Sequence, residues 1–170
     1  MDSKTILKNP GTAGKIHNII LIITLVLGIP VVAFGYVFLY LTSGEFADAA
    51  PEVAFMRTPL LVFSYIIVTA ILVMVVIMLV LAIKSIRKNI FDQGSIRMIF
   101  TMGHLLSFAF ITAVVMLIYT YAKIGREAGL VGIYMILMSL ILFSAANFVY
   151  FVGRLFQSAV SYKEENDLTV

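Results

Sequence analysis

The chain has 170 residues, of which 62% are hydrophobic and only 12% are charged, and its mean hydropathy is +1.07. A soluble domain is about half apolar and about a quarter charged, so this composition requires a lipid environment. The absence of cysteine excludes disulfides and thiolate metal sites. The net charge of +3 comes from cations that flank apolar runs. We therefore expect these cations to contact anionic lipid headgroups, with no direct binding of nucleic acid.

Four apolar runs, each long enough to cross a bilayer, divide the chain. They cover residues 16–42, 59–83, 99–123 and 129–157. The pattern predicts an all-α, polytopic membrane protein whose four transmembrane helices form one bundle over residues 16–157. A cytoplasmic arm, residues 1–15, precedes the bundle, and a polar cytoplasmic tail, residues 158–170, follows it. Residues 43–58, a stretch with more acids than bases, are expected to form a loop. The first run is too long for a signal peptide and is expected to be retained as a span.

A basic stretch lies between the second and third runs, and its single acid, Asp92, is expected to cap the following helix. We call its four cations the elbow: Lys84, Arg87, Lys88 and Arg97. Nine of the 12 Lys and Arg residues lie in the arm, the elbow and the C-terminal region. The positive-inside rule therefore places both termini in the cytoplasm. The elbow is expected to set this topology and to contact lipid headgroups, or alternatively to bind an acidic cytoplasmic partner.

The spans carry no acid or base near their centres, where a proton-coupled transporter would need one. Motifs typical of hydrolases, zinc peptidases and phosphate-binding loops are also missing from the sequence. We therefore predict no enzymatic activity, and no catalytic, cofactor or metal site.

One polar constellation follows from hairpin geometry. About five residues join the third and fourth runs, so these helices must be antiparallel neighbours. His104 lies 22 positions before Arg126, at the centre of the connection, and Asn147 lies 21 positions after it. We expect His104 to bond to Asn147 or Tyr150. The whole set, here called the polar seam, is His104, Ser107, Asn147, Tyr150 and Arg154. Such a seam normally joins packed membrane helices; the alternative is a ligand or pH-sensing pocket that opens to the cytoplasm.

The basic stretch also resembles a family motif. Lys88-Asn89-Ile90-Phe91 is followed by a polar cap, by Ile96-Arg97-Met98-Ile99 and by Gly103. This order is similar to that of the domain of unknown function 2975 family of small bacterial four-span membrane proteins, with Ile90 in place of a proline. The resemblance implies a multi-pass protein of the bacterial plasma (inner) membrane with no established activity. It also implies a regulatory role, because members of such families are often encoded beside a small helix-turn-helix regulator.

These observations favour an accessory or regulatory membrane protein that acts through protein contacts at its cytoplasmic face. Its partner would be a cytoplasmic regulator protein. The alternative is a small-molecule or ion permease that is completed by homo-oligomerisation.

Overall fold

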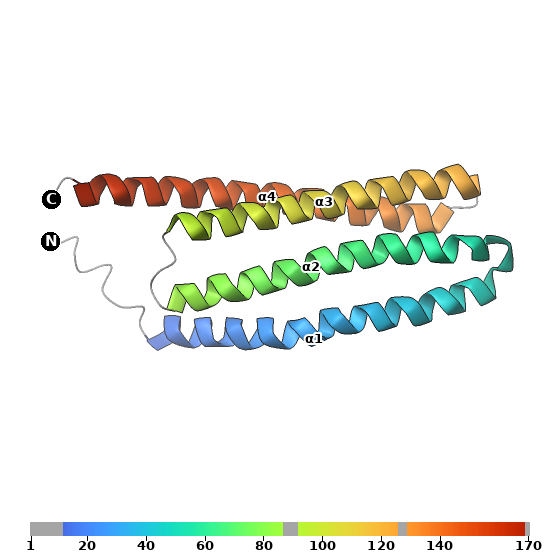
Figure 1. Ribbon diagram of the computed structural model, residues 1–170, viewed down its shortest axis with the longest axis horizontal. Helices are drawn as coiled ribbons and strands as arrows, with labels where there is room; N and C mark the ends of the chain where they lie inside the picture. Colours follow the sequence, from blue (N-terminus) through green and yellow to red (C-terminus); the bar gives the residue numbers. More distant parts are fainter. Residues whose placement is uncertain (1–11, 87–91, 126–128, 169–170) are drawn as a thin grey trace.

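The computed structural model describes residues 12–86, 92–125 and 129–168. The described elements are α1 (Thr12–Ala49), η2 (Pro51–Met56), α2 (Arg57–Ile86), α3 (Gln93–Ile124) and α4 (Gly129–Leu168). Within these ranges the chain is helical throughout apart from short turns, and it contains no strand. Successive helices run antiparallel, so the start of α1, the end of α2, the start of α3 and the end of α4 gather at one end (Figure 1).

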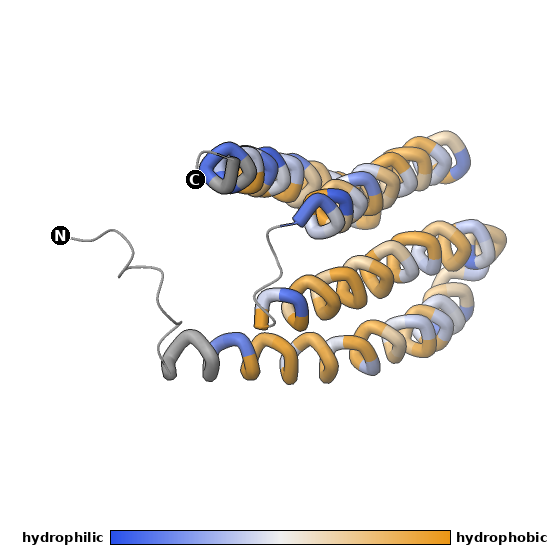
Figure 2. Tube along the Cα trace, turned by 60° about the vertical axis from the view of Figure 1, so that its left-hand side comes forward, coloured by the Kyte–Doolittle hydropathy of each residue, from blue (hydrophilic) through white to orange (hydrophobic). Residues whose placement is uncertain are grey.

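The four long helices are long and apolar enough to cross a membrane. The prediction of an all-α chain with four candidate spans is therefore confirmed. Hydrophobic residues predominate along all four helices (Figure 2). Many large apolar side chains remain exposed, especially on α1 and α4, as in a protein surrounded by lipid.

Residues 43–58 differ from the expected loop, because they are helical over almost their whole length. α1 continues to Ala49, and η2 and α2 follow almost without interruption. One glycine, Gly44, is tolerated inside a helix, whereas Pro51 disfavours a helical conformation at the residue before it. Pro51 then opens η2, where its missing N–H leaves no bond unmade. Acidic composition indicated a loop here, but helix-breaking residues decide where α1 ends.

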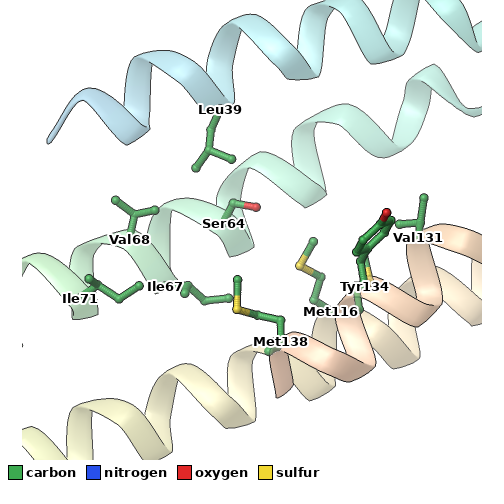
Figure 3. A pocket seen from close by; sticks show the side chains of 11 residues that line it. Leu39, Ser64, Ile67, Val68, Ile71, Met116, Val131, Tyr134 and Met138 are labelled. Atoms are coloured by element: carbon green, nitrogen blue, oxygen red, sulfur yellow. The ribbon is translucent and has the colours of Figure 1, made fainter. Parts of the chain in front are cut away.

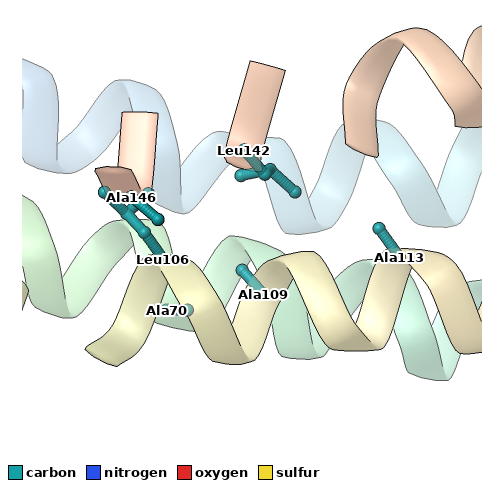
Figure 4. Close-up of a cluster of buried hydrophobic side chains, with 6 residues drawn as sticks. All are labelled: Ala70, Leu106, Ala109, Ala113, Leu142 and Ala146. Atoms are coloured by element: carbon teal, nitrogen blue, oxygen red, sulfur yellow. The ribbon is translucent and has the colours of Figure 1, made fainter. Parts of the chain in front are cut away.

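Extensive packing among the described helices follows chain order: α1 packs on α2, α2 on α3 and α3 on α4. A cluster of buried side chains from α2, α3 and α4 forms the centre of this arrangement (Figure 4). The cluster consists of Ala70, Leu106, Ala109, Ala113, Leu142 and Ala146. Four of these six residues are alanines, and small residues let membrane helices approach closely enough for extensive van der Waals contact.

Asp92 joins the end of α2 to the start of α3. One carboxylate oxygen, Oδ1, accepts a hydrogen bond of 2.7 Å from the backbone N–H of Ser95, so Asp92 is the N-cap of α3, as predicted. The other oxygen, Oδ2, lies 3.0 Å from the ammonium of Lys84 at the end of α2. Hydrogen bonding from Ser95, and then from Lys84, lowers the pKa of Asp92 from 3.8 to about 2.

Substitutions at Asp92 test this junction. Asp92→Ala removes the helix cap and the ion pair and is expected to lower the melting temperature of the detergent-solubilised protein at pH 7 more than Asp92→Asn, which keeps a side-chain acceptor for Ser95. Because the pKa of Asp92 is lower in the folded state, its carboxylate stabilises the fold above pH 3.8, and this contribution is lost as the pH falls through about 2. The difference in melting temperature between wild type and Asp92→Asn should therefore shrink towards pH 2. A difference that does not change with pH would contradict this assignment.

Candidate functional site

Tyr150 on α4 is the centre of the polar contacts between α3 and α4. Its hydroxyl lies 2.8 Å from Nδ1 of His104, and it accepts a longer hydrogen bond of 3.4 Å from the hydroxyl of Ser107. The rings of His104 and Tyr150 also meet edge to face, with centroids 5.5 Å apart and planes at 73°. One tyrosine therefore joins two polar residues of the neighbouring helix.

Gly103 makes room for the Tyr150 ring. A Cβ atom at Gly103 would lie 2.8 Å from Cε1 of Tyr150, closer than real contacts of this kind. Phe100, one turn before His104, lies with its ring centroid 6.3 Å from that of Tyr150. Gly103 entered the sequence argument only as part of a family motif; its physical role here is to let an aromatic side chain of α4 rest on the backbone of α3.

Asn147 and Arg154 do not join these contacts. The side-chain amide of Asn147 donates to the carbonyl of Phe143 on its own helix, at 2.8 Å, rather than to His104. Both residues are exposed, and with Tyr150 and Phe151 they line a cavity of about 310 Å³. Of the predicted polar seam, the structure thus brings together His104, Ser107 and Tyr150, while Asn147 and Arg154 lie beside them on the outer surface of α4.

The seam lies on an outward face of the α3–α4 pair. His104 is exposed, and Tyr150 is only partly buried. A different face of α4, which includes Phe148, Val152 and Phe156, lines a cavity shared with α1 and α2. A polar group on a lipid-facing surface is costly unless it forms a hydrogen bond. The Tyr150 hydroxyl, Nδ1 of His104 and the Ser107 hydroxyl meet this requirement by bonding to one another across the two helices.

The structure also gives the cations of the elbow different environments. Lys84 is half-buried in its ion pair with Asp92, whereas Arg97 is exposed on α3. Arg87 and Lys88 lie outside the described residues. Across the described part of the chain, no three His, Asp or Glu side chains are grouped so that they could hold a metal ion.

A second polar cluster, between α1 and α2, was not singled out from the sequence. The Tyr36 hydroxyl lies 2.7 Å from that of Thr69, and the Tyr65 hydroxyl donates to the backbone carbonyl of Tyr36 at 3.4 Å. Towards the connection, the Arg57 guanidinium lies over the Tyr40 ring, 5.3 Å from its centroid. Counting equal distances from the middle of residues 43–58 would have paired Tyr36 with Tyr65.

Comparison with known proteins gives one decisive result. The family model described as "protein of unknown function (DUF2975)" matches residues 41–170. The chain belongs to the DUF2975 family. No curated protein and no solved structure matches it. The part of the chain that defines DUF2975 membership runs from the end of α1 through α4, so the α2–α3 junction and the whole polar seam lie inside it.

The Tyr150 contacts can be tested in the purified DUF2975 protein. Tyr150→Phe keeps the ring on Gly103 but removes the hydroxyl, and it should lower the free energy of unfolding by about 0.6 kcal/mol, the usual contribution of a hydrogen bond between membrane helices. A double-mutant cycle with His104→Leu should show that the two effects are not additive. Tyr162→Phe, an exposed tyrosine further along α4, is the matched control. Additive effects would show that His104 and Tyr150 are not coupled.

Proposed function

We propose that this protein is an accessory or regulatory protein of the bacterial plasma (inner) membrane, without enzymatic activity of its own. Both termini lie in the cytoplasm, and the protein acts by contact with a cytoplasmic regulator protein. Membership of the DUF2975 family supports an integral membrane protein. Action through contacts is supported by the shape of the polar end, by which we mean the end of the molecule where the α2–α3 junction lies.

The observation that carries this proposal is the length of α4. This helix has 40 residues, about 60 Å, and a bilayer's hydrocarbon core is about 30 Å thick. α4 reaches past the start of α3 at the end of the molecule where the α2–α3 junction lies (Figure 1). The residues expected to form a polar tail are therefore helical up to Leu168, and they extend a membrane helix beyond the bundle. Such an extension presents fixed side chains to a partner.

The exposed side chains at this end suit protein recognition. Tyr162 on the extension is 69% exposed, and Lys163 beside it is exposed as well. Arg97 and Arg154 add exposed cations nearer the membrane. Aromatic and arginine side chains contribute most of the binding energy at many interfaces. Lys84, in contrast, is engaged by Asp92, so we assign it a structural role in the elbow.

A homo-oligomeric small-molecule or ion permease is the second candidate. The observation that favours it is the exposure of His104, Asn147 and Arg154 on one outer surface of α3 and α4. A second copy packed on this surface would enclose these polar groups between the two chains.

The proposed topology is tested by single cysteines, because the chain has none of its own. Glu52→Cys and Lys163→Cys each place a thiol at an exposed position, at opposite ends of the helices. A membrane-impermeant maleimide should label Glu52→Cys in intact cells and Lys163→Cys only after permeabilisation. The reverse pattern would contradict cytoplasmic termini.

The proposed contact is tested by purifying the full chain in mild detergent from its native membrane and identifying stoichiometric partners by mass spectrometry. The double variant Tyr162→Ala/Lys163→Ala should lose a cytoplasmic partner at least about tenfold, equivalent to about 1.4 kcal/mol. The matched control, Phe55→Ala/Lys123→Ala, removes an exposed aromatic residue and an exposed cation at the other end and should retain the partner. A homo-oligomer without any partner would contradict the regulatory proposal and favour the permease.

A further inference from the structure

A groove runs between α1 and α4 at the end of the molecule opposite the α2–α3 junction, with α2 and α3 as its floor. It consists of two adjoining cavities of about 380 and 240 Å³. The two cavities share five lining residues, among them Leu39, Ser64 and Val131, so they form one continuous space. All four long helices contribute to its walls, and it exists because α1 and α4 pack on their neighbours rather than extensively on each other.

The deeper cavity is almost wholly apolar. Side chains such as Ile67, Met116 and Met138 point into it from three different helices (Figure 3). Tyr134 stands at its rim with 71% of its surface exposed, so the space is open to the side, towards the membrane. A laterally open apolar space among membrane helices is accessible to an acyl chain directly from the bilayer.

The shallower cavity ends at a cation. Arg57, at the start of α2, lines this cavity and is half-buried. Its Nε donates to the Ser43 hydroxyl at 3.3 Å, and its guanidinium rests on the Tyr40 ring. These contacts with α1 fix the position of the charge, and Nε makes the only hydrogen bond of this guanidinium among the described residues.

The charge of Arg57 is not neutralised within the described part of the chain. Glu45, Asp48 and Glu52 all lie close to Arg57 in sequence, yet none of them forms an ion pair with it; the acid that does form one, Asp92, lies at the other end and pairs with Lys84. A fixed, half-buried guanidinium without a carboxylate attracts an external anion, and its planar fork suits the oxygens of a phosphate.

The dimensions of the groove match one leaflet of a bilayer. From Arg57 to Ile71, which lines the deep cavity, α2 advances 14 residues, or about 21 Å. Half of the hydrocarbon core is about 15 Å thick, which leaves a few ångströms for the headgroup region where Arg57 would lie. The cation and the apolar space therefore lie at the heights of a lipid's phosphate and its acyl chain.

We propose that this groove binds one anionic phospholipid from the adjacent leaflet, with its phosphate at Arg57 and an acyl chain along the cavity between α1 and α4. This site is separate from the polar end to which the regulatory contact is assigned, and it stands whether or not that contact exists.

The test uses the delipidated full chain in detergent, probed by native mass spectrometry with phosphatidylglycerol and with phosphatidylcholine of the same acyl chains. We expect one phosphatidylglycerol per chain, retained about tenfold more tightly than phosphatidylcholine. Arg57→Gln should abolish this preference, whereas Lys123→Gln, which removes an exposed cation at the same end, should keep it. Val131→Phe fills the groove and should lose both lipids. Val62→Phe, an exposed position on α2 outside the groove lining, is its control.

Arg57→Gln also removes the contacts of Arg57 with Tyr40 and Ser43. The Val131→Phe variant leaves those contacts intact and therefore tests the groove independently. Equal retention of the two lipids by the wild type would overturn the proposal, as would unchanged binding in Val131→Phe. A dimer that Val131→Phe converts to a monomer, with lipid retention unaltered, would show that a second copy of the chain fills the groove instead. Loss of the cytoplasmic partner on changing Tyr162 and Lys163 bears only on the regulatory proposal.

Discussion

Close approach of α3 and α4 is the constraint on which the rest of the arrangement depends. Lipid tails are as apolar as leucine, so no hydrophobic force drives membrane helices together, and their association relies on tight packing and a few polar bonds. Ala109, Ala113 and Ala146 supply the small surfaces at the centre of this contact. Gly103 and Gly132 extend it, since a Cβ at either position would collide with a tyrosine of the opposite helix.

The first hairpin is held together differently. α1 has exposed apolar side chains along most of its length, and hydrogen bonds among Tyr36, Tyr65 and Thr69 tie it to α2. The two hairpins meet where α2 packs on α3, so α1 and α4 form the outer members of the arrangement. α4 packs tightly on α3, and α1 packs on α2, so a space remains between α1 and α4. That space is the groove that ends at Arg57.

The sequence was sufficient for features that depend on local composition. Long apolar runs predicted the four spans, a single carboxylate before a helix predicted the Asp92 cap, and the short connection predicted that α3 and α4 are neighbours. It was insufficient where two solutions have similar energy. Asn147 could bond across to α3 or back to the carbonyl four residues earlier, and the structure has the second, which costs no interhelical alignment. α2 is so uniformly apolar that its pattern could not show which face packs on α1 and which lines the groove.

The two proposals concern opposite ends of one continuous helix. Val131 and Tyr134, near the start of α4, line the groove, and Tyr162, near its end, lies on the polar extension. A lipid in the groove would contact both α1 and α4, which do not pack extensively on each other. Since α4 is an unbroken helix between these points, a change in its tilt at Val131 must also move Tyr162.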